Sequence, residues 1–210
     1  MRITKYEHAC LDIQQDNTRI VIDPGEFTKS LIDLDNIDAV VITHIHGDHF
    51  NQSLINQIIT KNPNLKIWTT SEVTKSLEDK AMVANLQNIE KIGQVSLEFF
   101  GEEHAEIDPE TPVVQNIGVL IDNKLYYPGD SFTECPKSFE VLAVPASAPW
   151  LRVGQTIPLI KNSQCKQVFP THNALLSDAG HSVTNVWLEK FAERYNKVFN
   201  NLQPGDTLEI

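Results

Sequence analysis

The stretch VVITHIHGDH, residues 40–49, runs from apolar residues directly into three imidazoles and one carboxylate. In an extended segment, residues two apart point to the same side, so His44 and His46 can bind one ion together. The glycine that follows allows the backbone to turn sharply. After that turn, Asp48 and His49 can offer an oxygen and a nitrogen to a second ion close by. This donor set suits Zn²⁺, Mn²⁺ or iron.

Short β-strands are predicted on both sides of this stretch, because runs rich in Ile, Val, Leu and Tyr end at polar or Pro-Gly positions. In the first half of the chain these runs are residues 2–6, 10–13, 19–22, 39–42 and 66–69. Apolar residues at helical spacing predict a helix over residues 53–61. A second helix is expected to open at Ser71, with Glu72 in its first turn.

The second half of the chain returns to strands and then alternates strands with helices. Strands are predicted at residues 95–100, 113–121, 125–127, 141–144, 167–169 and 207–210, with a turn at Asp122-Asn123. Helices are predicted at residues 153–161 and 182–195. No repeat, linker or low-complexity segment interrupts the 210 residues, so we expect one domain over residues 1–210. Periodicity alone indicates only a mixed α and β class.

Composition and charge narrow the classes of partner. The formal net charge of −11 argues against broad contact with nucleic acid or anionic lipid, because both need Lys and Arg to neutralise phosphates. No segment approaches the roughly 18 apolar residues of a membrane span. The three cysteines have no zinc-finger spacing and no disulfide framework. We therefore expect a cytoplasmic protein that acts on a small molecule, with no nucleic-acid or membrane partner; a homo-oligomer is compatible with the sequence.

The H-x-H-x-D-H loop resembles the hallmark of the metallo-β-lactamase superfamily, and the later positions of that family's pattern are also present. The family's next His matches His104 in FFGEEH, its bridging carboxylate matches Asp130 in YPGDS, and its last His matches His172 in FPTHN. The Asp that steadies the family's metal loop matches Asp23 in VIDPG. The resemblance covers nearly the whole chain.

Within the superfamily, the chain is similar to the small single-domain branch that includes the ascorbate-6-phosphate lactonase-like proteins. Both open with a G-H-A-like segment followed by a strand and I-D-P, although Glu7 stands here in place of the Gly. The resemblance implies an α/β (α+β) fold, a four-layer αββα sandwich of two central sheets faced by helices. The site would lie along one edge, where the strands end.

The resemblance also implies a two-metal site and a mechanism. His44, His46 and His104 would hold one divalent ion and Asp48, His49 and His172 the other, with Asp130 bridging them; zinc comes first among the candidate metals, before manganese or iron. A metal-bound water with a lowered pKa would attack the substrate. Asp48 and Asp130 are thus the catalytic carboxylates. We expect Asp23 to hold the ligand loop by hydrogen bonds without binding a metal.

The implied function is hydrolysis of an ester, lactone or phosphoester in a small, anionic molecule. Antibiotic-hydrolysing members typically carry a Cys where Asp130 stands, so β-lactam hydrolysis is disfavoured. The alternatives are an iron-dependent oxidoreductase with the same ligand set, a phosphodiesterase or nuclease, and a binding protein that keeps the metals without turnover. The net negative charge of the chain disfavours the nuclease alternative, because it would repel nucleic acid.

Four further residues are candidates for the substrate pocket. Trp150 and Arg152 lie in a segment between a predicted strand and helix, where binding residues are common, and a guanidinium suits an anionic group. His181 lies close to a predicted helix start, shortly after His172. His8 fits the family's opening but has no ligand position left, so a structural or pocket-wall role is favoured over a role in the chemistry.

Overall fold

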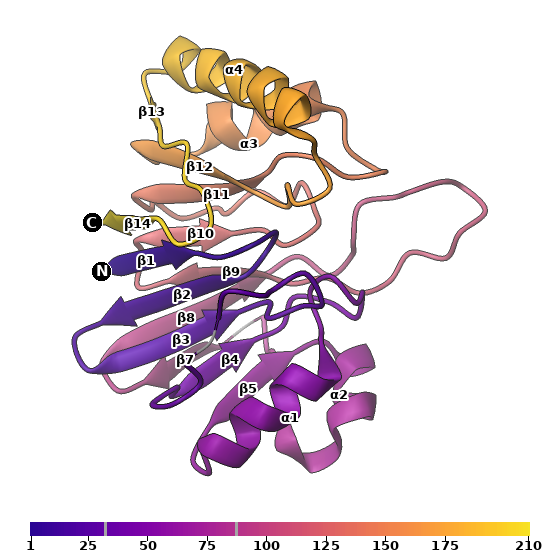
Figure 1. The fold of residues 1–210 in the computed structure, drawn as a ribbon, viewed down its shortest axis with the longest axis vertical. Coiled ribbons are helices and arrows are strands. Elements are labelled where there is room, and N and C mark those ends of the chain that lie inside the picture. Colours follow the sequence, from indigo (N-terminus) through magenta and orange to yellow (C-terminus); the bar gives the residue numbers. More distant parts are fainter. Residues whose placement is uncertain (32, 87) are drawn as a thin grey trace.

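The computed structural model describes residues 1–31, 33–86 and 88–210, and its strands form two facing sheets (Figure 1). The first sheet has the order β14-β1-β2-β3-β4-β5-β6. Its strands are β1 (Arg2–Lys5), β2 (Leu11–Gln15), β3 (Thr18–Ile22), β4 (Ala39–Val41), β5 (Lys66–Thr69), β6 (Met82–Val83) and β14 (Thr207–Glu209). Pairing is antiparallel from β14 to β3 and parallel from β3 to β6.

The second sheet has the order β13-β12-β11-β10-β9-β8-β7. Its strands are β7 (Ile89–Ile92), β8 (Val95–Phe100), β9 (Gly118–Ile121), β10 (Leu125–Tyr127), β11 (Val141–Pro145), β12 (Gln167–Thr171) and β13 (Val198–Phe199). The strands from β10 to β13 are parallel. Because β8 and β10 are both antiparallel to β9, the end of β8 lies at the same edge as the ends of β10, β11 and β12.

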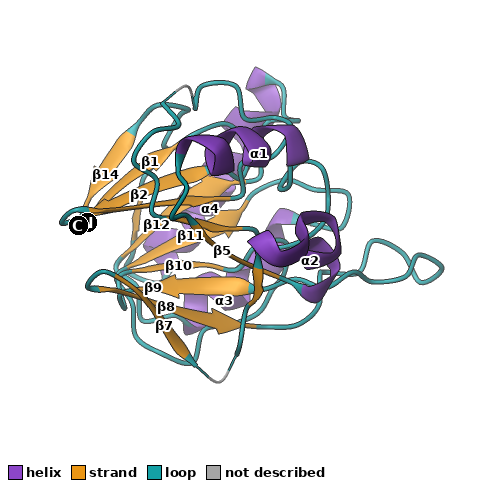
Figure 2. Ribbon diagram, turned by 90° about the horizontal axis from the view of Figure 1, so that it is seen from below, coloured by secondary structure: helices purple, strands orange, loops and turns teal. Residues whose placement is uncertain are grey.

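Helices cover the outer face of each sheet (Figures 1 and 2). The first sheet carries α1 (Gln52–Lys61), α2 (Ser71–Leu77) and a 3-10 turn, η1 (Glu78–Lys80). The second carries a 3-10 turn, η2 (Val153–Thr156), followed by α3 (Ile157–Asn162) and α4 (Asp178–Arg194). With the two sheets between them, these helices make the four-layer αββα sandwich that the resemblance to the metallo-β-lactamase superfamily implies.

Three apolar clusters hold these layers together. The central cluster lies between the sheets and includes Ile13, Phe99 and Phe169, all buried. A second cluster packs α1 against the first sheet, and a third packs α4 against the second sheet. Side-chain caps fix where the helices begin, since Asn51 accepts a hydrogen bond from an N–H in the first turn of α1 and Ser177 does the same for α4.

Two element boundaries differ from the sequence prediction by four or five residues, and the helix predicted over residues 153–161 is divided into η2 and α3. The strand predicted over residues 113–121 begins only at Gly118, because residues 114–116 pair locally with residues 102–104 at the base of a long loop. That loop, residues 105–113, projects from the body of the molecule (Figure 1). The helix predicted to begin at residue 182 begins at Asp178, where Ser177 caps it. The short strands β6, β7 and β13 were not predicted; several of their residues are exposed.

Among the residues that the structure describes, no helix combines the length and the apolar character that crossing a bilayer requires.

Candidate metal centre

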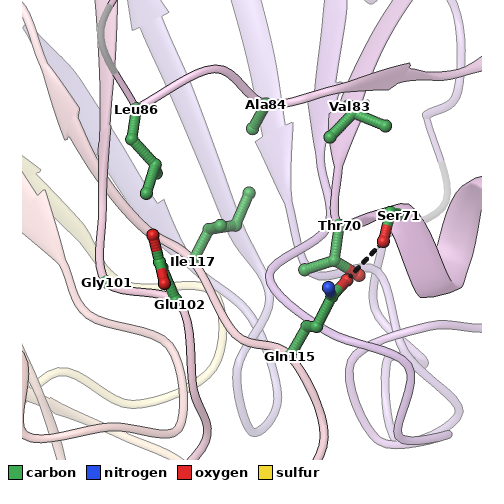
Figure 3. Close-up of a pocket in the computed structure, with 9 residues that line it drawn as sticks. All are labelled: Thr70, Ser71, Val83, Ala84, Leu86, Gly101, Glu102, Gln115 and Ile117. Atoms are coloured by element: carbon green, nitrogen blue, oxygen red, sulfur yellow. Dashed lines mark hydrogen bonds between the residues drawn. The ribbon is translucent and has the colours of Figure 1, made fainter.

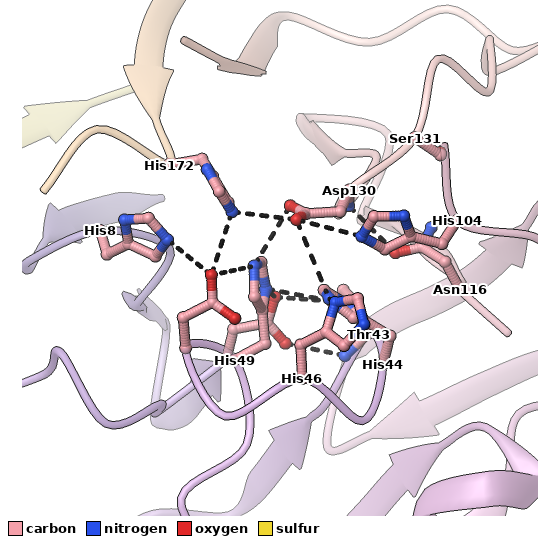
Figure 4. Close-up of polar contacts among 12 residues, drawn as sticks. His8, Thr43, His44, His46, His49, His104, Asn116, Asp130, Ser131 and His172 are labelled. Carbon is pink, nitrogen blue, oxygen red and sulfur yellow. Dashed lines mark hydrogen bonds and ion pairs between the residues drawn. The ribbon is translucent and has the colours of Figure 1, made fainter. Parts of the chain in front are cut away.

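The candidate site lies at the edge where strands of both sheets end (Figure 4). The ligand loop follows β4, and the other candidates follow β8, β10 and β12. All seven predicted ligands meet there. Their possible donor atoms form overlapping groups, each with its members within 4.8 Å of one another: His44, His46 and His104; His44, His49 and Asp130; and Asp48, His49, His172 and His8.

Asp130 occupies the middle of the cluster. Its Oδ2 lies 2.9 Å from Nε2 of His172, 3.4 Å from Nε2 of His104 and 3.9 Å from Nε2 of His44. Its Oδ1 lies 3.2 Å from Nε2 of His49. The two oxygens therefore face imidazoles of both predicted ion sites, as a bridging carboxylate must.

Asp48 lies on the more open side of the same cluster. Its Oδ2 is 3.2 Å from Nε2 of His172 and 3.8 Å from Nε2 of His49. The Asp48 side chain is 24% exposed, whereas that of Asp130 is 3% exposed. Solvent, and any substrate, can therefore reach the cluster on the Asp48 side.

Four of the imidazoles present Nε2 to the centre because an oxygen acceptor holds Nδ1. The Nδ1 contacts are Asp23 Oδ2 for His49 at 2.7 Å, the Ala105 carbonyl for His104 at 2.6 Å, the Ser147 carbonyl for His172 at 2.6 Å and Thr43 Oγ1 for His44 at 3.0 Å. An acceptor at Nδ1 selects the tautomer that carries its proton there, which leaves the Nε2 lone pair for a metal.

The residues fit a divalent metal. Nε2 of His49, Nε2 of His104 and Oδ1 of Asp130 are buried without a hydrogen-bond partner in the described structure. Nδ1 of His46 lies 3.1 Å from Nε2 of His44, so two imidazole nitrogens face each other. Unpaired buried polar atoms are costly, and a bound cation would satisfy them together.

The electrostatics also favour positive charge at the centre. Burial alone would raise the pKa of Asp130, but His49 and His172 hold it well below its usual range. Burial alone would lower the pKa of His172, but Asp130 and Asp48 raise it to about 9. Burial lowers the pKa of His44 well below its usual value, which keeps that imidazole neutral. A metal ion can replace the imidazole protons that the two carboxylates stabilise here.

Asp23 holds the ligand loop from beneath. Its Oδ1 accepts the Thr43 backbone N–H at 2.7 Å, and its Oδ2 accepts both the Thr43 hydroxyl and Nδ1–H of His49 at 2.7 Å. Gly25 lies so close to the loop that an added Cβ would be 1.9 Å from the carbonyl oxygen of Asp48. The segment after β3 and the ligand loop are therefore in direct backbone contact.

Sequence reasoning missed four residues that orient ligands, one of them Ala105, whose carbonyl faces Nδ1 of His104. Thr43 bonds both Asp23 and His44, and Ser147 offers its carbonyl to His172. Asn116 Oδ1 accepts the backbone N–H of Asp130 at 3.0 Å. Only Thr43, which directly precedes the first His of the motif, stands at a position that the sequence could have singled out.

The predicted pocket residues lie at different distances from the cluster. Trp150 is buried, with its ring centroid 5.5 Å from that of His104 and 6.0 Å from that of His172. His181 lies in the first turn of α4, half-buried, and lines a cavity together with His8. Arg152 is exposed at the start of η2, and its role as an anion contact stays a prediction.

Two facing sheets with a His and Asp cluster at their shared edge define a metal-dependent hydrolase of the metallo-β-lactamase fold. The chain belongs to the β-lactamase superfamily, since residues 2–172 match the model of the family described as "Beta-lactamase superfamily domain".

Curated relatives support this assignment. The chain is 26% identical over 182 residues to Protein Rv0786c of Mycobacterium tuberculosis, an alignment that covers 84% of this chain and 86% of the relative. It is 33% identical over 93 residues to a UPF0173 metal-dependent hydrolase of Flavobacterium johnsoniae, covering 42% and 40% of the two chains.

Solved structures share the fold at low sequence identity. Igni18, a metallo hydrolase from Ignicoccus hospitalis, aligns with a TM-score of 0.73 at 20% identity over 100% of this chain and 98% of its own. CmlA, a diiron β-hydroxylase from Streptomyces venezuelae, aligns with a TM-score of 0.74 at 12% identity over 100% of this chain and 54% of its own.

Proposed function

We propose that this protein hydrolyses an ester, lactone or phosphoester bond in a small anionic molecule, with two divalent ions bound at the cluster. The observation that carries the proposal is the placement of Asp130 between the two sets of imidazoles. Seven donor groups exceed what one ion can use. When bound, such an ion pair would supply Lewis acidity and lower the pKa of a water molecule towards neutrality.

The protein's own residues prepare the site for that chemistry. Asp130 holds both sets of ligands in one arrangement, and Asp48 marks the side from which a substrate can approach. Trp150 packs against His104 and His172 and excludes water from that wall. No Ser or Cys nucleophile is needed for this reaction.

Two cavities near the metal cluster are of a size for a small molecule, and His8, which contacts Asp48, lies in the lining of the first. One cavity of about 410 Å³ includes Lys29, Asn173 and His181 in its lining. Its one acidic lining residue, Glu7, is already engaged, because its carboxylate accepts hydrogen bonds from the backbone of Lys29 and Ser30 and from the Ser30 hydroxyl. The groups that remain available are mainly hydrogen-bond donors, which supports an anionic ligand.

A second cavity, of about 200 Å³, spans the ends of both sheets (Figure 3). The side chains of Val83, Leu86 and Ile117 give it an apolar lining, and a hydrogen bond of 2.9 Å from Ser71 to Gln115 crosses one end. The segment from residue 102 to residue 116 carries five carboxylates and no Lys or Arg, so it should repel polyanions such as RNA.

An iron-dependent oxidoreductase is the second candidate. The similarity in fold to the diiron β-hydroxylase CmlA supports this second candidate, since that protein uses the fold for iron chemistry. Iron content and the optical spectrum of protein purified without chelators distinguish the two candidates.

The test is a panel assay of the metal-loaded protein on lactones, phosphodiesters, thioesters, nitrocefin and single-stranded RNA. We expect the highest turnover on small phosphorylated compounds and none in Asp130→Ala, which loses the residue placed between the ion sites. Arg152→Ala should raise the Michaelis constant if its guanidinium binds the anion; an unchanged constant would remove it from the pocket. Higher turnover of RNA or nitrocefin would contradict the proposed substrate class.

A further inference from the structure

We propose that His8 is a positioning residue of the second ion site. Its side chain holds Asp48 in place beside His172 and binds no metal itself. The inference rests on the two-ion function proposed above. It concerns an imidazole whose Nε2 lies 3.0 Å from Oδ2 of Asp48, inside the group of possible ligands.

The hydrogen bonds of His8 define its tautomer. Its Nδ1 lies 3.2 Å from the backbone N of Ala174, and because a backbone N–H can only donate, Nδ1 must be the acceptor. The ring proton is therefore on Nε2, which donates to Asp48. This is the reverse of His49, His104 and His172, whose Nδ1 atoms face oxygen acceptors. The Nε2 of His8 has no lone pair to offer a metal.

The turn between β1 and β2 also holds the segment after β12. The backbone N–H of His172 donates to the carbonyl of His8 at 2.9 Å, and Nζ of Lys5 donates to Oδ1 of Asn173 at 3.3 Å. With the bond from Ala174 to the His8 ring, three successive residues of the second sheet's loop are fixed, two by this turn and one by the last residue of β1. His172 is thus tied to its position by the backbone of His8.

His8 joins this segment to a ligand from the other sheet. Asp48 lies on the loop after β4 of the first sheet, whereas His172 follows β12 of the second. The His8 ring is 1% exposed and packs against the rings of His172 and Phe27, with centroids 3.9 and 5.0 Å away. Contacts that fix the ring therefore also fix Oδ2 of Asp48. Among the described residues, His8 contacts Asp48, His49 and His172 and makes no contact with His44, His46 or His104, so its influence should be confined to the second ion.

Three substitutions separate the two bonds of the ring. His8→Gln places an amide N–H near the Nε2 position and keeps the donor to Asp48. His8→Asn places a carbonyl near the Nδ1 position and keeps the acceptor for Ala174; Asn also tolerates the φ of 59° found at His8. His8→Phe keeps a ring for packing and removes both bonds.

The experiment titrates metal-free parent and variants with Co²⁺, by calorimetry and by the cobalt absorption spectrum, and fits the two sites separately. We expect His8→Phe to weaken the second site by about 10- to 100-fold, the effect typical of residues that orient ligands, and to leave the first site unchanged. His8→Gln should recover most of the loss and His8→Asn little of it. Gly154→Ala, where an added Cβ meets nothing within 4 Å, is the control and should bind both ions as the parent does.

Several results of this titration would contradict the proposed role of His8. Unchanged second-site affinity in His8→Phe, equal weakening of both sites, or better recovery with Asn than with Gln would overturn the inference. A parent protein that never takes up a second equivalent would refute the two-ion function on its own. The ¹⁵N spectrum of the metal-free protein tests His8 in either case, because we expect its proton on Nε2; a proton on Nδ1 would overturn the assignment.

Discussion

At the scale of single residues, Lys5 is the least usual side chain outside the metal cluster. It is 0% exposed, and its ammonium donates only to the carbonyl of Tyr6 at 3.1 Å and to Asn173. No ion pair with a carboxylate is present for it among the described residues. Burial lowers the pKa of Lys5 from 10.5 to about 8. A buried charge without a counterion costs stability, and in return the Lys5 ammonium holds Asn173, the residue after His172.

Replacing Lys5 should reveal that cost through pH. Below pH 8 the ammonium is charged in both states, and the folded state carries the full penalty. Between pH 8 and about 10.5 the folded state releases the proton while the unfolded state keeps it, so the parent gains stability relative to Lys5→Met. The unfolding free energy of the parent should therefore rise by up to about 3 kcal/mol relative to that of Lys5→Met over this pH range. Urea unfolding at pH 7 and pH 10 measures it, and a pH-independent difference would argue against a buried ammonium.

At the scale of elements, the metal loop depends on the segment after β3. An added Cβ at Gly25 would lie 1.9 Å from the carbonyl oxygen of Asp48. That oxygen is a backbone atom, so it cannot move aside as the end of a flexible side chain could. One of the two segments must therefore move in Gly25→Ala. The prediction is a loss of about 1 to 3 kcal/mol in unfolding free energy, together with weaker binding of the ion at Asp48.

Gly154→Ala is the matched control, because an added Cβ there meets nothing within 4 Å. It should leave metal affinity unchanged and shift the unfolding free energy by no more than a few tenths of a kcal/mol. Urea unfolding and cobalt titration of both variants make the comparison. Equal behaviour of the two alanine variants would show that the segment after β3 yields without disturbing the loop.

The same scale shows what could be predicted from the sequence. The apolar run before His44 predicts β4 and the metal loop that follows it, because both depend on local spacing. The positions of Ser147 and Asn116 beside the ligands depend on which strand ends become neighbours in the folded sheets, and no local pattern encodes that. The start of β9 was missed for a related reason, since residues before Gly118 pair with residues 102–104 and not with the sheet.

At the scale of the whole molecule, the candidate ligands come from both sheets. His44 and His49 follow a strand of the first sheet, whereas His104, Asp130 and His172 follow strands of the second. Ions that bind this folded arrangement and not the unfolded chain stabilise the whole sandwich by mass action. Metal content should therefore be visible in global unfolding.

Removal of metal with a chelator should lower the melting temperature, and added Zn²⁺ should restore it. At a free metal concentration 100-fold above Kd the gain is about 2.7 kcal/mol per ion, or roughly 5 to 10 °C for a protein of this size. Calorimetric scans with and without metal measure the shift, and Asp130→Ala should show much less of it. Identical scans of the parent in both conditions would mean that no ion binds the folded state preferentially.

The pairing of β14 with β1 has a consequence for how the chain is made. Residues 2–4 of the first strand pair with residues 207–209, and the amino group of Met1 donates to the carbonyl of Ile210. A ribosome delivers on the order of 5 to 20 residues per second, so β1 waits on the order of 10 to 40 s for its outer neighbour. Throughout that interval its unpaired N–H and C=O groups form an open edge, the kind of edge that recruits other nascent chains. β1 is thus made before the other strands of its sheet yet is among the last to be completed, and slower translation lengthens its exposure.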